Sequence, residues 1–255
     1  MPYVKSKGTN IYYESHGSGP AIIFAHGAGG NAAIWYNQLA YFKDTHQCIA
    51  FDHRAFARSP ADDTSITIPS FRDDILAIMD ELKVDRAHLV GQSMGGYSVL
   101  RCALDAPERV NTLTLSCTPA GIPIPNPTEA VQNLGSRGAE GIQATMSKNT
   151  FKSPALVQLY ASIQSFNTEF SFDRLSALRH EEDQVSREAL RSMQIPTLFI
   201  SGKEDPLFLP EQLSQLVPLF HNAKIEIVED AGHSPYFEQP NIFNRLLETH
   251  IDQSN

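Results

Sequence analysis

Residues 91–96 read GQSMGG, and the pentad Gly91 to Gly95 fits G-x-S-x-G, a pattern in which the central serine can act as a nucleophile. A serine hydroxyl is a weak nucleophile at neutral pH, so Ser93 would need a base and an acid that orients the base. The pentad alone also fits a glycine-rich turn between a strand and a helix, and roughly one chain in ten of this length contains it by chance. The base and the acid must therefore be identified before Ser93 can be assigned as a nucleophile.

His233 is the best placed of the nine histidines to serve as the base. It lies in VEDAGHSPYFEQP, after the last apolar strand-like run, on a loop opened by Gly232 and before a helix expected from Pro240. The position at the end of a strand favours His233 over histidines that fit turns, strand edges or helix faces, which are His16, His46, His88, His180, His221 and His250. His26 and His53 follow other strands and belong to other loops.

Asp205 is the expected acid, since it lies between the serine and the histidine in the chain and near another strand end. It follows PTLFIS by a few residues and precedes a proline that stiffens the loop. Glu204 is adjacent but should project in another direction. Asp230 is too close to His233 along the chain to come from a separate strand.

Two backbone amides are expected to bind the negative charge that develops on an attacked carbonyl oxygen. The amide of Met94 lies at the start of the helix that follows Ser93. The second should come from the loop after AIIFAH, where HGAGG lets a backbone N–H approach the substrate. We expect Ala28 to supply it, with Gly27 as the alternative.

The elements that would hold these residues alternate between short β-type runs and stretches of helical period. This alternation predicts an α/β fold: a mostly parallel, eight-stranded sheet with helices on both faces. The first two strands are expected to form a hairpin through KGTN. The predicted strands are YVKS (3–6), NIYYES (10–15), AIIFAH (21–26), QCIAF (47–51), AHLVG (87–91), VNTLTLS (110–116), PTLFIS (196–201) and KIEIV (224–228).

A long segment between the sixth and seventh predicted strands exceeds an ordinary crossover. It opens with a proline-rich break and then turns helical, with one helix expected to start at Ser153-Pro154. We therefore predict a core domain formed by residues 1–118 and 195–255, with residues 119–194 inserted as a helical cap. Leu156, Tyr160 and Phe166 are candidate walls of an apolar substrate pocket, together with Phe170 and Phe172. Packing between helices is the alternative role for this stripe.

The composition is that of an ordinary globular protein, with 42% hydrophobic and 19% charged residues among 255. A formal net charge of −9 without a basic run argues against nucleic acid or an anionic membrane as the partner. The first residues contain no apolar block, so we expect a cytoplasmic protein. Cys48, Cys102 and Cys117 lack metal-like spacing and are expected to be reduced and buried. Neither a metal nor an organic cofactor is expected.

Taken together, these motifs resemble the α/β-hydrolase fold superfamily, in its capped branch with a serine nucleophile. The order Ser93, Asp205, His233 is that superfamily's own order. The dehalogenases and epoxide hydrolases of this superfamily have aspartate at the position of Ser93, so the serine argues against both activities. The resemblance spans nearly the whole chain outside the cap and rests on HGAGG (26–30), DHRAFARS (52–59), GQSMGG (91–96), SGKEDPLFLP (201–210) and AGHSPYFEQP (231–240).

One block departs from its common form. Relatives often have glycine where this chain has Ala55 and Ala57, in the pattern Asp-x-Arg-Gly-x-Gly-x-Ser. Asp52 and Arg54 are still expected to bracket this loop, although the alanines leave its geometry open.

The resemblance implies a serine hydrolase that cleaves a carboxylic ester or lactone through an acyl-enzyme. An alternative on the same triad is a C–C bond hydrolase of vinylogous diketones, because EDPLFLP is similar to the acid loop of that group. HGAGG, however, lacks the proline common in their oxyanion loop. Cofactor-free perhydrolases and lyases share the scaffold, and a small-ligand receptor without turnover is a further alternative. In every case the expected partner is a small molecule with an apolar part, and the sequence specifies neither its identity nor the oligomeric state.

Overall fold

The structure, a computed structural model, describes residues 2–132, 144–168, 171, 174–175, 178 and 185–254. Its centre is one eight-stranded sheet with the strand order β1-β2-β4-β3-β5-β6-β7-β8. The predicted fold class and all eight predicted strands are confirmed, with ends that differ by at most one residue. The strands are β1 (Tyr3–Ser6), β2 (Thr9–His16), β3 (Ala21–Ala25), β4 (Gln47–Phe51), β5 (Ala87–Gln92), β6 (Val110–Ser116), β7 (Thr197–Gly202) and β8 (Ala223–Val228).

Six strands run parallel, from β4 through β3 and β5 to β8, and β1 and β2 add an antiparallel edge. The predicted hairpin between β1 and β2 is confirmed, with Tyr3 opposite Tyr12. Lys7 and Gly8 both have positive φ, 46° and 86°. Two central residues in the left-handed region are what a tight hairpin turn of matching twist requires.

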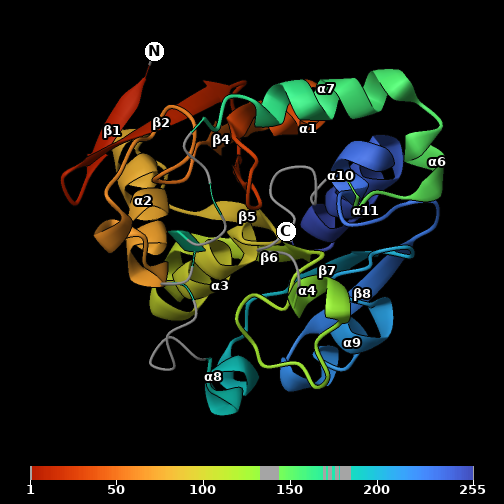
Figure 1. Cartoon of the computed structure of the whole chain (residues 1–255). Helices are drawn as coiled ribbons and strands as arrows, with labels where there is room; N and C mark the ends of the chain where they lie inside the picture. Colours follow the sequence, from red (N-terminus) through yellow and green to blue (C-terminus); the bar gives the residue numbers. More distant parts are fainter. Residues whose placement is uncertain are drawn as a thin grey trace.

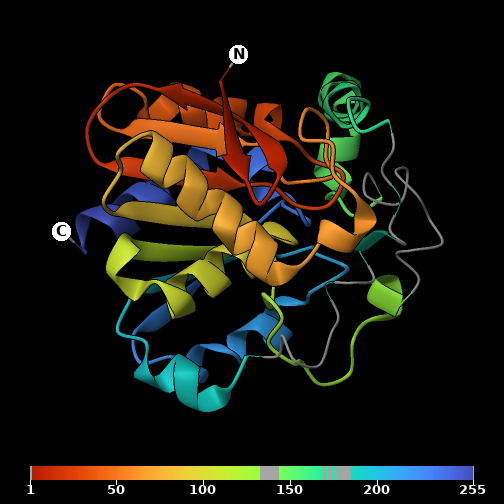
Figure 2. The same ribbon diagram turned by 90° about the vertical axis from the view of Figure 1, so that its left-hand side faces the viewer.

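Helices cover both faces of the sheet (Figures 1 and 2). The α-helices are α1 (Tyr36–Phe42), α2 (Ile68–Glu81), α3 (Gly95–Asp105), α4 (Glu129–Gln132), α6 (Lys148–Phe151), α7 (Pro154–Gln164), α8 (Arg187–Ser192), α9 (Pro210–Ser214), α10 (Pro235–Glu238) and α11 (Pro240–Asp252). Short 3₁₀ helices are η1 (Ala32–Trp35), η2 (Asp63–Ser65), η3 (Pro107–Arg109) and η7 (Val217–Leu219).

Successive side chains of β3 point to opposite faces of the sheet and pack in two different buried clusters. Ile23 packs with residues of α2 and α3 in one buried cluster, whereas Ile22 and Phe24 pack with residues of α1 and α11 in another. Alternation of this kind follows from the two-residue period of a strand and explains why β3 is apolar at every position. The centre of the sheet is therefore buried on both faces, and its parallel strands end at one common edge.

Within the predicted insertion, α7 begins at Pro154 with Ser153 at its N-cap, as expected from the sequence. Figures 1 and 2 place α7 and α8 at opposite ends of the molecule. Leu190 and Met193 at α8 belong to the same buried cluster as the sheet residues Leu113 and Phe199. The division into a core of residues 1–118 and 195–255 and a cap of residues 119–194 remains a prediction. No helix in the described part of the chain has the length and apolarity needed to cross a membrane.

Candidate active site

Ser93 lies on a sharp turn between β5 and α3. Its φ is +50°, a left-handed conformation that is uncommon for a residue other than glycine. The turn needs glycine on both sides: a Cβ at Gly91 would overlap the backbone of Gly95, and a Cβ at Gly95 would overlap the carbonyl of Ala25. The strained turn leaves the Ser93 side chain partly exposed at the edge of the sheet where the parallel strands end.

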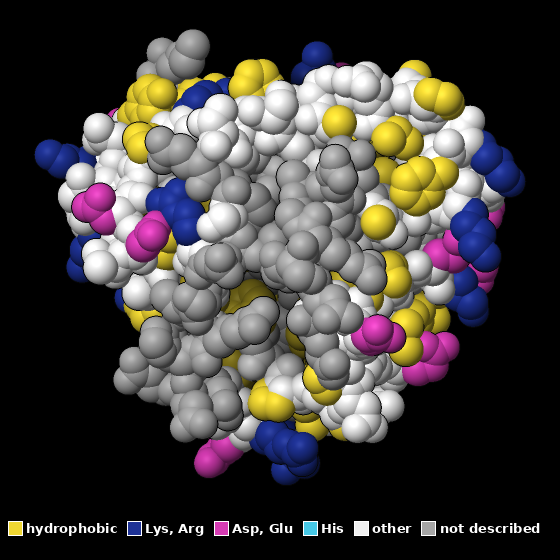
Figure 3. Space-filling model, viewed as in Figure 1, with side chains coloured by type: hydrophobic (Ala, Val, Ile, Leu, Met, Phe, Trp, Pro, Cys, Tyr) yellow, Lys and Arg dark blue, Asp and Glu magenta, His cyan; other side chains and the backbone are white. Residues whose placement is uncertain are grey.

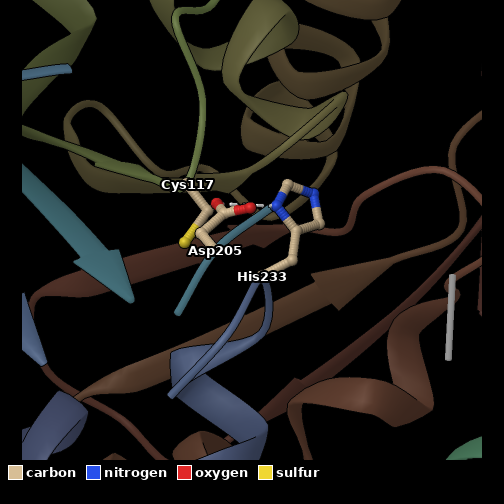
Figure 4. A group of neighbouring side chains, drawn as sticks. All are labelled: Cys117, Asp205 and His233. Carbon is tan, nitrogen blue, oxygen red and sulfur yellow. Dashed lines mark hydrogen bonds and ion pairs between the residues drawn. The ribbon is translucent and has the colours of Figure 1, made fainter. Parts of the chain in front are cut away.

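His233 and Asp205 face each other across two loops that follow β8 and β7 (Figure 4). Nδ1 of His233 lies 2.9 Å from Oδ2 of Asp205, and both side chains are buried. Because a carboxylate only accepts hydrogen bonds, this contact fixes the tautomer of a neutral imidazole with the proton on Nδ1. Nε2 is then free of its proton and can act as a base.

The second oxygen of Asp205 is held by its own loop. Oδ1 accepts hydrogen bonds from the amides of Leu207 (2.8 Å) and Phe208 (3.3 Å). The loop thus fixes the carboxylate in the orientation that directs Oδ2 to His233. Glu204, the neighbouring acid, instead accepts a hydrogen bond from the amide of Lys148.

Cys117 completes the group in Figure 4, since its Sγ and the ligand atoms of Asp205 and His233 all lie within 4.8 Å of one another. A thiolate, a carboxylate and an imidazole are a donor set that binds zinc. The 2.9 Å between Nδ1 and Oδ2 is a hydrogen-bond length, however, and two atoms that share a tetrahedral zinc would lie about 3.3 Å apart. Burial and the nearby Asp205 carboxylate also raise the pKa of the Cys117 thiol well above its usual value, which favours the protonated form.

Gln92 connects the serine turn to the histidine loop. Its Nε2 donates a 2.9 Å hydrogen bond to the main-chain carbonyl of His233. The structure therefore brings Ser93, next to Gln92 in the chain, and the His233–Asp205 pair to the same edge of the sheet. Within the part of the chain that is described, no hydrogen bond joins the Ser93 hydroxyl to His233. Hydrogen bonds between a nucleophile and its base are often long before substrate binds and shorten in the complex.

The expected oxyanion loop is a tight turn beside Ser93. The amide of Gly30 donates to the carbonyl of Gly27 at 3.0 Å, and Gly29 has a φ of +75°. A Cβ on Gly27 would lie 3.0 Å from the Cβ of Ser93, so this loop passes directly beside the serine. Ala28, at the second position of the turn, packs against the cluster that contains Met94. Among the described residues, the amides of Ala28 and Met94 donate no hydrogen bond.

The His26 side chain stabilises this turn through hydrogen bonds of both ring nitrogens. Its Nδ1 donates to the carbonyl of Gly27 at 2.7 Å, and its Nε2 accepts from the amide of His53 at 3.0 Å. Burial lowers the pKa of His26 to about 4, which keeps the ring neutral and allows Nε2 to accept. His26 therefore has both ring nitrogens occupied and serves the shape of the loop.

The predicted pocket residues differ in their surroundings. Tyr160 is buried, and its hydroxyl lies 3.4 Å from Oγ of Ser234, next to His233. Leu156 is partly buried in the same cluster as Tyr160, whereas Phe166 is 64% exposed, which does not support a place in a pocket wall. Apolar side chains gather in Figure 3 where Figure 1 places α6 and α7. Phe170 and Phe172 lie outside the described residues.

The loop with two alanines in place of glycines does adopt glycine-like geometry. Ala55 and Ala57 have φ values of 68° and 39°. Asp52 and Arg54 bracket the loop, but each has its own partner: Asp52 binds Arg58 at 2.7 Å, and Arg54 forms a buried two-point ion pair with Asp74.

Sequence reasoning missed three polar residues that hold the site together: Gln92, Glu238 and Asn167. Asn167, just after α7, donates from Nδ2 to the carbonyls of Gly29 (2.7 Å) and Gly30 (3.1 Å). Its Oδ1 accepts from the amide of Ala57 at 2.9 Å. These partners lie more than a hundred residues away in the chain, so no local pattern could indicate them.

Residues 20–149 match the family model described as the alpha/beta hydrolase fold. A putative carbamate hydrolase, RutD, of Azorhizobium caulinodans is 26% identical, and the alignment covers 97% of each chain. The 3-oxoadipate enol-lactonase 2 of Acinetobacter baylyi is 28% identical, over 92% of this chain and 90% of the lactonase. Among solved structures, the N-acyl homoserine lactone degrading enzyme Est816 superposes with a TM-score of 0.82 at 27% identity, covering 97% of this chain and 99% of that one.

Proposed function

The chain belongs to the alpha/beta hydrolase fold family, and on this basis we propose that it is a serine hydrolase that cleaves a carboxylic ester or a lactone. The three similar proteins described above are named a putative carbamate hydrolase, an enol-lactonase and a lactone-degrading enzyme, so all three share the hydrolase class. We propose, beyond this class, which bond the protein cleaves and which residues cleave it. The observation that carries it is the 2.9 Å contact between His233 Nδ1 and Asp205 Oδ2, at the edge of the sheet where the Ser93 turn lies.

In the proposed reaction, Nε2 of His233 takes the proton of the Ser93 hydroxyl as its oxygen attacks the substrate carbonyl carbon. The carbonyl π bond opens, and its electron pair moves to the oxygen. The amides of Ala28 and Met94 stabilise this oxyanion, each by about 10²- to 10³-fold in rate. Asp205 keeps the imidazole in its tautomer and stabilises its positive charge.

The tetrahedral intermediate collapses as His233 returns the proton to the alkoxide leaving group. An ester thereby releases its alcohol, whereas a lactone keeps the new hydroxyl within the acyl-enzyme. Water then attacks the acyl carbon with His233 again as the base, and the carboxylic acid leaves Ser93.

A lactone is supported by two similar proteins, one named an enol-lactonase and one a lactone-degrading enzyme. Tyr160 lies beside Ser234, next to His233, and packs in one apolar cluster with Leu156, which supports a substrate with an apolar part.

The test is a substrate panel run on the protein and on Ser93→Ala. The panel contains p-nitrophenyl acyl esters, acyl homoserine lactones, an aryl carbamate and a dienoate ring-fission product. We expect turnover of an ester or lactone that the Ser93→Ala variant loses. Rapid turnover of the dienoate alone would assign a C–C bond hydrolase, and turnover of the carbamate alone would assign a different acyl group.

A further inference from the structure

Glu238 is a buried carboxylate at the end of α10, with a relative exposure of 7%. Its Oε1 accepts hydrogen bonds from the amides of Gly232 and Ser234, both at 3.0 Å. Its Oε2 accepts from the amide of Ser147 at 2.7 Å and from the hydroxyl of Thr150 at 2.9 Å. All four donors are neutral, so main-chain amides and a hydroxyl compensate the desolvation of this carboxylate.

Two of these donors flank His233 directly in the chain. The main chain of His233 itself is also held on both sides: its amide donates to the carbonyl of Thr145 at 2.9 Å, and its carbonyl accepts from Gln92. The main chain that carries the imidazole is therefore fixed from three directions. Its remaining freedom is rotation of the side chain, which Asp205 limits.

The other two donors belong to the start of α6, within the predicted cap. The segment Thr145–Thr150 lies so close to the histidine loop that a Cβ on Gly232 would overlap the main chain of Thr145 and Ser147. Figure 1 shows α6 beside α10, although the two helices are far apart in the sequence. Glu238 joins the segment to the loop through its side chain, because it accepts hydrogen bonds from both, and the hydrogen bond from the His233 amide to Thr145 is a second link between them.

We propose that Glu238 is a positioning residue for His233. It holds the main chain on both sides of the histidine and makes residues 147–150 part of the framework that sets the imidazole relative to Ser93. This inference rests on the proposed triad. An error of about 1 Å in the placement of a catalytic group can reduce the rate 10²-fold, so the loss of this carboxylate should reduce turnover.

Glu238→Gln tests the proposal, because it preserves shape but turns one oxygen into an NH₂ donor that faces other donors. We expect kcat to fall about ten- to a hundredfold with KM within about twofold of the parent. The matched control is Glu248→Gln on α11, where the glutamate is partly exposed and accepts one hydrogen bond, from Tyr41; its kcat should not change. The concentration of folded protein is measured by near-ultraviolet circular dichroism, so that kcat refers to folded molecules.

A merely structural role would lower the thermal midpoint and the folded fraction but leave kcat per folded molecule unchanged, and that result would overturn the proposal. A rise in KM at constant kcat would also overturn it, since it would place Glu238 in substrate binding.

If Glu238→Gln does not fold, Thr150→Val removes the hydrogen bond from the Thr150 hydroxyl to Glu238 and, with it, the 3.1 Å hydrogen bond between the hydroxyls of Thr150 and Ser147. It leaves the two hydrogen bonds from Gly232 and Ser234 in place. We then expect kcat to fall about two- to fivefold at unchanged KM, and an unchanged kcat would refute the inference. The proposed function fails separately: in that case Ser93→Ala or His233→Ala would keep full activity, whatever the Glu238 variant does.

Discussion

Nδ1 of His233 and Oδ2 of Asp205 lie 2.9 Å apart, in a buried pair supplied by the loops after two neighbouring parallel strands. If Asp205 fixes the imidazole tautomer, Asp205→Asn should lower kcat about 10³- to 10⁴-fold, since an amide can direct its NH₂ at Nδ1 and favour the wrong tautomer. Steady-state kinetics on the best substrate of the panel measures this.

The matched control is Glu204→Gln, one residue away on the same loop. Glu204 accepts a hydrogen bond from the Lys148 amide, and in the described part of the chain no hydrogen bond or ion pair joins it to His233. We expect its kcat to stay within about threefold of the parent. A larger loss for Glu204→Gln than for Asp205→Asn would reassign the acid.

The proposed oxyanion donor Ala28 can be tested although it acts through its backbone. Ala28 is the second residue of the Gly27–Gly30 turn, a position that proline favours, so Ala28→Pro removes the N–H at little cost to the turn. We expect kcat to fall about 10²- to 10³-fold. Ala28→Ser, which keeps the amide, should stay within a few-fold of the parent. Equal activity of the two variants would exclude this amide from the site.

Ala55 and Ala57 should make the chain less stable than glycine would. Both have φ in the left-handed region, where an L-residue with a Cβ is strained by about 1–2 kcal/mol. Glycine also increases the entropy of the unfolded chain, which lowers stability by about 0.4–1 kcal/mol. Each Ala→Gly change should therefore raise the free energy of unfolding by about 0 to 1.6 kcal/mol.

Urea unfolding measures this, with Ala77→Gly inside α2 as the control, which should instead destabilise by about 1 kcal/mol. Destabilisation at all three positions would mean that the loop does not hold the two alanines in this conformation.

Stability should fall in mild acid because of buried histidines. Burial lowers the pKa of His26, His88 and His250 to about 4, from an ordinary value of 6.5. The unfolded chain therefore binds protons first, so their contribution to stability is present above pH 6.5 and is lost as the pH falls towards 4. Each should contribute a slope of up to about 1.4 kcal/mol per pH unit.

Urea midpoints between pH 7.5 and 4.5 measure this slope. The variant His88→Gln should reduce the slope of stability against pH by the contribution of one buried histidine. The same change at exposed His221 should leave the slope unchanged. A stability that stays constant over this range would contradict the assignment of neutral, buried rings.

The strands and the order of the proposed triad could be predicted because their signals are local. A parallel strand buried on both faces is a continuous apolar run, as in β3, and a functional residue at its carboxyl end follows it directly in the chain. Ser93, Asp205 and His233 all have this relationship to a strand.

The residues that hold the site could not be predicted, because each of them has at least one partner far away in the chain. In the sequence, Glu238 does not differ from an ordinary polar surface residue. Only the fold brings Ser147, 91 residues away in the chain, into contact with it. The short helix α10 that carries Glu238 was also missed, since four residues are too few for a helical period. The pairing of Arg54 with Asp74 depends in the same way on how α2 packs, whereas Asp52 and its partner Arg58 belong to the same loop.

The central claim is that Ser93 is the nucleophile, and covalent labelling tests it most directly. The Ser93 oxygen should attack the phosphorus of a fluorophosphonate and displace fluoride, while His233 takes the hydroxyl proton. The adduct should appear in the tryptic peptide of residues 87–101. That peptide also contains Ser98, so fragment spectra must place the adduct. We expect modification at Ser93 that Ser93→Ala abolishes and that His233→Ala slows strongly. Active protein that remains unlabelled, or that carries the adduct on Ser98 or in another peptide, would contradict this account.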